Sequence, residues 1–167
     1  VFASNPSKFL AFDVDGILTT GQVFYAGEEV GFNRQFHIQD GYGMKTLMQA
    51  GIKVGIITGG DSLGVTKRFE YLGLDFIHTG NEDKRKAFAE VLEKAQVLPE
   101  EVLYMGDEFF DLPILKRVGF SATVPSASYE VRAEVDYITN REAGMGCARE
   151  VIDLVRHTQN IVPKIEY

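Results

Sequence analysis

The chain has 167 residues, of which 45% are hydrophobic and 25% charged, and its formal net charge is −7. Its length predicts one domain, residues 1–167, that buries roughly 70% of its unfolded surface. The negative charge argues against a protein that binds nucleic acid or an anionic membrane, because both need basic surfaces.

The single cysteine, Cys147, excludes an intrachain disulfide and a cysteine-based zinc site. No apolar run reaches the roughly 18 residues of a membrane span, and we identify no signal peptide. These features predict a cytoplasmic protein. The chain starts at Val1 rather than Met, so we expect a trimmed chain or a piece of a longer protein.

The first third of the chain predicts a strand, a hairpin and a helix. "FLAFDV" at residues 9–14 is a continuous apolar run, typical of a strand buried on both faces of a parallel sheet. Residues 22–38 predict a projecting β-hairpin with strands at about 22–25 and 32–38. A helix is predicted over residues 41–51.

Strands and helices alternate along the rest of the chain. Further strands are predicted at residues 53–59, 75–80, 101–107, 120–124 and 137–139. Helices are predicted at residues 61–73, 83–96, 110–119, 127–135 and 147–160, the last leading into a tail that ends at 167. This alternation predicts an α/β fold with a doubly wound, Rossmann-like parallel sheet, whose ligand crevice lies beyond the carboxyl ends of the strands.

Polar side chains follow four of these strands. In chain order they are Asp13 and Asp15, then Thr58 and Gly59, then Lys84, and finally Asp107, Glu108 and Asp111. Carboxylate oxygens are the ligands that Mg²⁺ prefers, and a carboxylate is also a nucleophile that forms an aspartyl phosphate. The pattern predicts phosphoryl transfer to Asp13, with Lys84 and the Thr58 hydroxyl on the phosphoryl oxygens.

The spacing of the first two aspartates suggests a division of roles. Side chains of an extended strand alternate with a period of two, so we expect Asp13 and Asp15 to point the same way. Asp15 then protonates the leaving alcohol oxygen and deprotonates the attacking water. Gly16 allows a sharp backbone turn beside the phosphate.

The segments "DVDGILT", "IITGG", "EDKRKA" and "GDEFFD" resemble, in this order, the four motifs of the haloacid dehalogenase-like phosphatases. The resemblance covers residues 13–111. It implies Asp13 as the nucleophile, Asp15 as the acid and base, and Thr58, Gly59 and Lys84 as phosphate ligands. It also implies an Mg²⁺ ion held by Asp13, the Asp15 backbone carbonyl and Asp107, with Glu108 and Asp111 nearby.

Members of this superfamily often carry a cap domain between the first and second motifs, or between the second and third. Here the chain from Asp13 to Thr58 has room only for a hairpin and a helix, and that from Thr58 to Lys84 only for a helix and a strand. We therefore expect no cap domain. An open site admits water, so a macromolecular substrate or a neighbouring subunit must cover it.

The hairpin and the tail "AGMGCAREVIDL" are similar to the 3-deoxy-D-manno-octulosonate 8-phosphate phosphatases, a capless subfamily, and extend the resemblance to about residues 8–160. The resemblance implies a sugar acid phosphate substrate from lipopolysaccharide precursor synthesis. It also implies a homotetramer in which the hairpins lie at the subunit interface. The match to "FHIQDG" places Asp40 and Gly41 near the substrate.

Three positions depart from the subfamily. Gly60 and Met145 stand where basic residues are common, and Glu108 stands where Asp is common. The two missing cations leave open a substrate such as 2-keto-3-deoxynononate 9-phosphate or another sugar phosphate. Arg34, in the second predicted strand of the hairpin, is interpreted as a surface charge.

Two other classes of function stay open. One is a non-catalytic domain of this fold within a sugar-activating enzyme, although a degenerate site is expected to lack at least one of the residues that this chain retains. The other is a phosphatase for protein or nucleic-acid phosphates, which the acidic balance and the matches of hairpin and tail disfavour.

Overall fold

The six-stranded sheet of this protein is parallel throughout. The computed structural model describes residues 6–166, so Val1 and the extreme ends of the expected 1–167 domain lie outside the described residues. Six strands pair in the order β5-β4-β1-β6-β7-β8. They are β1 (Phe9–Phe12), β4 (Lys53–Ile57), β5 (Phe76–His78), β6 (Val102–Met105), β7 (Phe120–Thr123) and β8 (Tyr137–Ile138).

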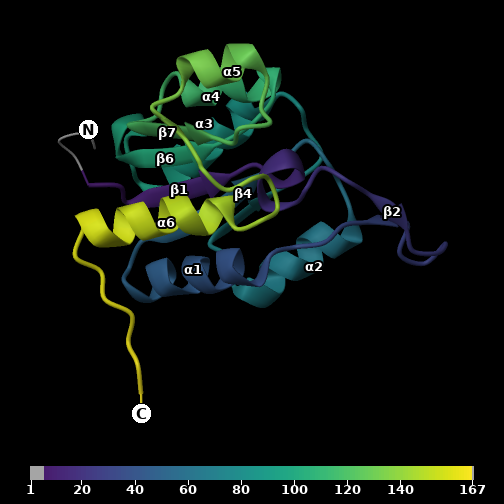
Figure 1. Cartoon of the computed structure of the whole chain (residues 1–167), viewed down its shortest axis with the longest axis horizontal. Helices are drawn as coiled ribbons and strands as arrows, with labels where there is room; N and C mark the ends of the chain where they lie inside the picture. Colours follow the sequence, from purple (N-terminus) through teal and green to yellow (C-terminus); the bar gives the residue numbers. More distant parts are fainter. Residues whose placement is uncertain (1–5, 167) are drawn as a thin grey trace.

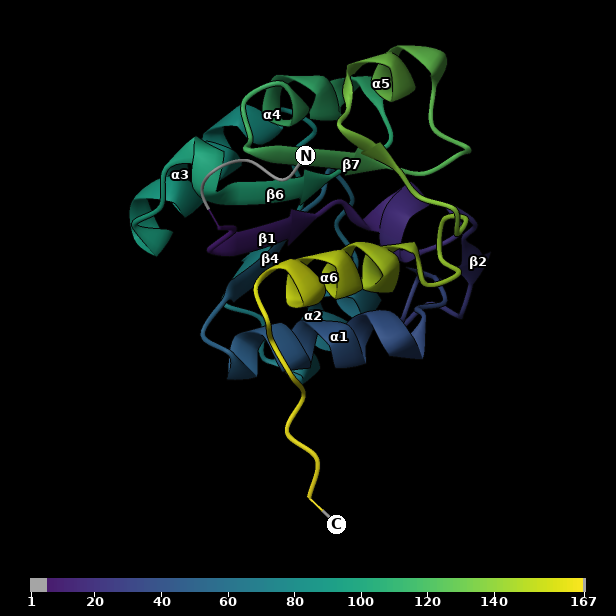
Figure 2. The ribbon, with the colours of Figure 1, turned by 60° about the vertical axis from the view of Figure 1, so that its left-hand side comes forward.

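Helices cover both faces of the sheet, as the alternating pattern predicts (Figures 1 and 2). One face carries α1 (Ile38–Gln49), α2 (Leu63–Leu72) and α6 (Cys147–Thr158). The other carries α3 (Lys84–Ala95), α4 (Leu112–Leu115) and α5 (Tyr129–Glu134). The doubly wound α/β fold is therefore confirmed. Within residues 6–166, no helix has the length and apolar character needed to cross a membrane.

The central strand β1 fixes the position of the site. All four of its residues are fully buried, which explains why the run "FLAF" contains no polar residue. The chain continues from β1 to β4 on one side and reaches β6 on the other. The sheet reverses its strand order at this point, and ligand crevices of open α/β sheets form there. Residues that follow β1 and β6 therefore meet at one edge.

The chain leaves the extended conformation directly after Asp13. β1 ends at Phe12, and Val14–Leu18 form a tight turn in which Gly16 has a φ of +88°. A side chain on Gly16 would collide with the Asp107 carboxylate as well as require a left-handed backbone. The expectation that strand alternation aligns Asp13 with Asp15 is wrong, because the strand does not extend to Asp15.

The hairpin projects from the sheet and its helices (Figure 1). Its paired strands are short, with β2 at Phe24–Tyr25 and β3 at Phe32–Asn33. The predicted strand to residue 38 is too long, because α1 already begins at Ile38. The backbone N–H of Gln39 donates to the side chain of His37, which caps the helix at that point.

Candidate active site

A buried lysine lies at the centre of the strand-end cluster. The Lys84 side chain is fully buried, and its Nζ lies 2.8 Å from Asp13 Oδ1 and 2.7 Å from Asp111 Oδ1. The Lys84 Nζ also donates to the Tyr104 hydroxyl at 3.3 Å and lies 4.7 Å from the centre of the Phe110 ring. Burial lowers the pKa of Lys84, but the two carboxylates outweigh it and raise the pKa, so the ammonium form is retained.

Asp111 contacts both this lysine and the loop after β6. Its Oδ1 accepts from the Tyr104 hydroxyl at 2.6 Å, and its Oδ2 accepts from the backbone N–H groups of Asp107 and Glu108, both at 3.1 Å. A side chain at position 106 would collide with the Asp111 carboxyl group, and Gly106 avoids this collision. Asp111 is thus a structural support that orients the loop carrying Asp107.

Three carboxylates converge beside the single ammonium of Lys84. Ligand oxygens of Asp13, Asp107 and Asp111 all lie within 4.8 Å of one another. Burial and the charge of Asp111 raise the pKa of Asp13 to about 6, although Lys84 lowers it. Burial and the charges of Asp13 and Asp111 raise the pKa of Asp107 to about 8. The cluster therefore has more negative charge than Lys84 alone neutralises.

The same cluster fits a divalent cation. Asp107 Oδ1 is buried and has no hydrogen-bond partner, so it is available to a ligand. Mg²⁺ prefers hard oxygen ligands and one or two carboxylates, which Asp13 and Asp107 provide. A cation there would also stabilise the charged form of both carboxylates.

Thr58, Gly60 and Asp15 lie together on the neighbouring side of the site. Thr58 follows β4 and is buried, and its Oγ1 accepts from the Gly60 backbone N–H at 3.3 Å. A Cβ on Gly60 would lie 3.3 Å from Asp15 Oδ2 and 3.8 Å from Thr58 Oγ1. Gly59 packs against Glu82, leaving only 3.0 Å between the Glu82 Cγ and an added Cβ.

Arg34 is not a surface charge. Its side chain is only 9% exposed and forms a two-pronged ion pair with Asp15. The sequence contains no local signal for this pair, because the two residues are 19 positions apart and on different elements. Tyr104 was also missed, although a lone hydroxyl in the apolar strand β6 is a visible signal.

Asp40 and Gly41 lie in α1, packed against other helices. Asp40 Oδ1 accepts from the backbone N–H of Arg149 at 2.8 Å, in the first turn of α6, while its Oδ2 is buried without a partner. A Cβ on Gly41 would lie 2.6 Å from Arg68 Nη2 in α2. These contacts give both residues a packing role, and no described contact joins either of them to the carboxylate cluster.

The glycine-rich tail lies on the turn that follows Asp13. The Gly144 backbone N–H donates to the Ile17 carbonyl at 2.9 Å, and the buried Cys147 Sγ donates to the same carbonyl at 3.1 Å. Met145 is 59% exposed. The tail thus supports the turn, and Met145 brings no cation to it.

Glu108 lies in the loop after β6. Its carboxylate accepts from the backbone N–H of the next residue, Phe109, at 2.8 Å.

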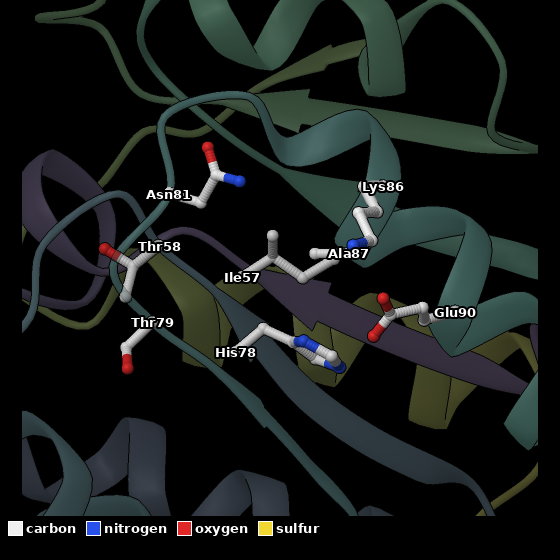
Figure 3. Close-up of a pocket in the computed structure, with 8 residues that line it drawn as sticks. All are labelled: Ile57, Thr58, His78, Thr79, Asn81, Lys86, Ala87 and Glu90. Carbon is white, nitrogen blue, oxygen red and sulfur yellow. The ribbon is translucent and has the colours of Figure 1, made fainter.

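A cavity of about 210 Å³ adjoins Thr58. Figure 3 shows Thr58, Thr79 and Asn81 on one side of it and Lys86, Ala87 and Glu90 of α3 on the other. Its lining combines apolar surface with the polar side chains of Thr58, Asn81 and Lys86, among others, and it opens beside the carboxyl ends of β4 and β5. A polar molecule that contacts Thr58 therefore has room at this edge of the sheet.

The fold and the carboxylate–lysine cluster are those of a haloacid dehalogenase-like hydrolase, and the profile of that family matches residues 43–119. The chain is 37% identical over 150 residues to the 3-deoxy-D-manno-octulosonate 8-phosphate phosphatase KdsC of Escherichia coli K12, covering 89% of this chain and 78% of that protein. The Haemophilus influenzae KdsC is 36% identical over 154 residues, 91% of this chain and 84% of that protein.

Solved structures agree. The phosphatase of Moraxella catarrhalis, in complex with magnesium ion, phosphate ion and KDO, superposes with a TM-score of 0.87 and 38% identity, over 92% of this chain and 88% of that one. The Yersinia pestis phosphatase gives a TM-score of 0.88 with 34% identity, over 92% and 83% of the two chains. This chain belongs to the family of the 3-deoxy-D-manno-octulosonate 8-phosphate phosphatases.

The packing role of Asp40 predicts a particular pH dependence of stability. Burial raises the pKa of Asp40 to about 6, and the Arg149 hydrogen bond and the charges of His37, Arg141 and Arg149 offset this only in part. A raised pKa in the folded state means that Asp40 costs stability as the pH rises from about 4 to 6. We expect Asp40→Asn to have a free energy of unfolding higher than wild type by roughly 1–3 kcal/mol at pH 7, with a smaller difference at pH 4.

Chemical denaturation at both pH values measures this difference. The matched control is Asp153→Asn in α6. Burial raises the pKa of Asp153, but hydrogen bonds from Arg149 and Arg156 lower it overall, so this variant should be less stable than wild type at pH 7. A loss of stability at pH 7 in Asp40→Asn would contradict the account of Asp40 as a buried, incompletely paired carboxylate.

Proposed function

We propose that this protein is an Mg²⁺-dependent phosphomonoesterase that hydrolyses 3-deoxy-D-manno-octulosonate 8-phosphate to the free sugar acid and phosphate, in lipopolysaccharide precursor synthesis in the cytoplasm. The observation that carries this proposal is the buried Asp13 carboxylate, held 2.8 Å from Lys84 at the switch point of the sheet. Membership of the family supports this substrate, because the relatives that align with most of the chain are named 3-deoxy-D-manno-octulosonate 8-phosphate phosphatases.

Asp13 is the nucleophile in this proposal. Its carboxylate oxygen forms a bond to phosphorus while the bond between phosphorus and the leaving alcohol oxygen breaks, which gives an aspartyl phosphate. Asp15 donates a proton to the leaving oxygen. In the second half-reaction Asp15 takes a proton from water as that water attacks phosphorus, and the bond to Asp13 breaks.

Lys84, Thr58 and Gly59 bind the phosphoryl group. The Lys84 ammonium lies beside the attacking carboxylate, so it stabilises negative charge on the phosphoryl oxygens during transfer. The Thr58 hydroxyl and the Gly59 backbone are the polar groups at the end of β4. The next residue, Gly60, lies between Thr58 Oγ1 and Asp15 Oδ2. These groups orient the phosphoryl group for attack in line with Asp13.

Asp13, Asp107 and the backbone carbonyl of Asp15 would hold Mg²⁺, with Asp111 and Glu108 supporting the loop that carries Asp107. The unpartnered Asp107 Oδ1 and the raised pKa values of Asp13 and Asp107 support this assignment. When bound, the ion supplies charge that offsets the repulsion between the carboxylates and the phosphoryl oxygens.

The identity of the sugar depends on groups outside this cluster. Gly60 and Met145 bring no cation toward a substrate carboxylate, which favours testing 2-keto-3-deoxynononate 9-phosphate as a second candidate. Asp40 and Gly41, which the resemblance assigns to substrate binding, lie in α1 and contact α6 and α2. Their contact with the substrate stays a prediction.

The exposed apolar side chains of the hairpin support a homotetramer in which the hairpins lie at the subunit interface. It exposes several large apolar side chains, each at least 38% exposed: Val23, Phe24, Tyr25, Val30 and Phe32. Monomers rarely leave such a patch in water, and the described site has no cap domain to exclude solvent. A second copy of this chain is the partner that buries the patch and covers the site.

The reaction is tested with Asp13→Asn. An amide does not attack phosphorus, so we expect hydrolysis of a generic aryl phosphate and of 3-deoxy-D-manno-octulosonate 8-phosphate to fall at least about a thousandfold, while the circular dichroism spectrum stays that of the folded protein. Chelation of Mg²⁺ should have the same effect on wild type, and added Mg²⁺ should restore the rate. Hydrolysis by Asp13→Asn within tenfold of wild type, or in the presence of chelator, would refute the mechanism.

A panel of phosphorylated sugars and sugar acids then fixes the substrate. The proposal expects the highest kcat/KM for 3-deoxy-D-manno-octulosonate 8-phosphate. A higher kcat/KM for the nine-carbon sugar acid phosphate would leave the mechanism intact and replace the substrate.

The assembly is tested with the double variant Phe24→Ser and Phe32→Ser. Phe24 and Phe32 are 49% and 61% exposed, so their loss should cost the subunit little stability and should dissociate the tetramer. Sedimentation equilibrium measures the mass, and Phe109→Ser, 56% exposed but outside the hairpin, is the control. A wild-type protein that sediments as a monomer, or a double variant that stays tetrameric, would contradict this role of the hairpin.

A further inference from the structure

The segment that follows β3 delivers an arginine to Asp15. Arg34 Nε donates to Asp15 Oδ1 at 2.6 Å, and its Nη2 donates to Asp15 Oδ2 at 2.9 Å. Bidentate pairs of this kind are stronger and more directional than single hydrogen bonds. The Arg34 side chain is 9% exposed and that of Asp15 is 34% exposed, so the pair is sheltered on the arginine side and open on the carboxylate side.

The arginine itself is fixed at its other end. Its Nη1 donates at 2.8 Å to the hydroxyl of Ser62, which also accepts from the Val65 backbone N–H as the cap of α2. The guanidinium thus connects the turn after β1 to the start of α2. Movement of Asp15 relative to α2 would break the contact of Arg34 with Asp15 or its contact with Ser62.

The two oxygens of Asp15 differ in their surroundings. Oδ1 accepts from Arg34 and also from the Thr19 hydroxyl at 3.1 Å. Oδ2 accepts only from Arg34 among the described residues and faces Gly60, where an added Cβ would lie 3.3 Å away. Because Gly60 has no side chain, Oδ2 keeps an open acceptor position on the side of Thr58.

We propose that Arg34 is the positioning residue for Asp15, so that Oδ1 is held by Arg34 and Thr19, while Oδ2, held by Arg34, exchanges the proton at its open position. This inference rests on the proposed function. The proton on Oδ2 passes to the leaving oxygen as phosphorus bonds to Asp13, and a proton of the attacking water returns to Oδ2 as the aspartyl phosphate is hydrolysed. Arg34 contacts neither the substrate nor phosphorus and acts only through Asp15.

Leaving groups that differ in basicity separate this role from a structural one. Departure of 2,4-dinitrophenolate needs no proton, whereas the alkoxide of 3-deoxy-D-manno-octulosonate 8-phosphate needs one. The ratio kcat/KM reports the step up to phosphoryl transfer for each substrate. Arg34→Met should lower kcat/KM for the sugar phosphate about 10- to 100-fold and leave that for 2,4-dinitrophenyl phosphate within about threefold. Arg34→Lys should show the same pattern with a smaller loss.

A double-variant cycle with Asp15→Asn gives the decisive comparison. If Arg34 acts through Asp15, adding Arg34→Met to Asp15→Asn should cause no further loss for either substrate. Equal losses for both substrates in Arg34→Met, or a full further loss in the double variant, would overturn the inference, because Arg34 would then bind the substrate or maintain the fold. Should Arg34→Met fail to fold, Arg34→Lys and its double variant with Asp15→Asn provide the same cycle.

The same data distinguish failure of this inference from failure of the proposed function. Absence of hydrolysis by wild type, or an Asp15→Asn variant that shows no dependence on the leaving group, would refute the proposed function and this inference with it. A leaving-group dependence in Asp15→Asn that Arg34→Met and Arg34→Lys do not share would refute the positioning role alone.

Discussion

The buried ammonium of Lys84 is the interaction on which the rest of the site depends. A fully buried lysine is costly unless it is paired, and here two carboxylates and a tyrosine hydroxyl surround it. Through Asp13 it connects the end of β1, and through Asp111 it connects the loop after β6. Lys84 itself begins α3, so one positive charge joins three elements at the switch point of the sheet.

This arrangement leaves negative charge in excess, and that excess suits the chemistry. The raised pKa values of Asp13 and Asp107 show that Lys84 does not satisfy both carboxylates. The Asp107 carboxylate, whose Oδ1 is buried and unpartnered, lies against Gly16, the residue that allows the turn after Asp13. The turn at Gly16 thus lets the carboxylate oxygens of Asp13 and Asp107 approach each other. Such a group of oxygen ligands suits a divalent cation better than a second lysine or arginine side chain.

The parts of this structure that sequence predicts are those set by burial and periodicity. Continuous apolar runs predict the strands of a parallel sheet, and such a sheet brings the residues after β1, β4 and β6 to one edge, which is where the sequence places Asp13, Thr58 and Asp107. The sequence does not predict the orientation of Asp15, because the chain turns at Val14 and because Arg34, far along the chain, fixes the carboxylate. Side-chain pairs between distant loops have no periodic signal, and for the same reason the α6-capping contact of Asp40 was missed.

The most direct test of the account is chemical identification of the nucleophile. Wild-type protein is mixed rapidly with 2,4-dinitrophenyl phosphate and Mg²⁺, treated with borohydride, which reduces an aspartyl phosphate to homoserine, and sequenced by tandem mass spectrometry. The account predicts homoserine at position 13 alone, because Asp13 lies beside Lys84 directly after β1, whereas both oxygens of Asp111 accept hydrogen bonds within the protein. Homoserine at position 15 or 107, or at no position during steady turnover, would contradict it.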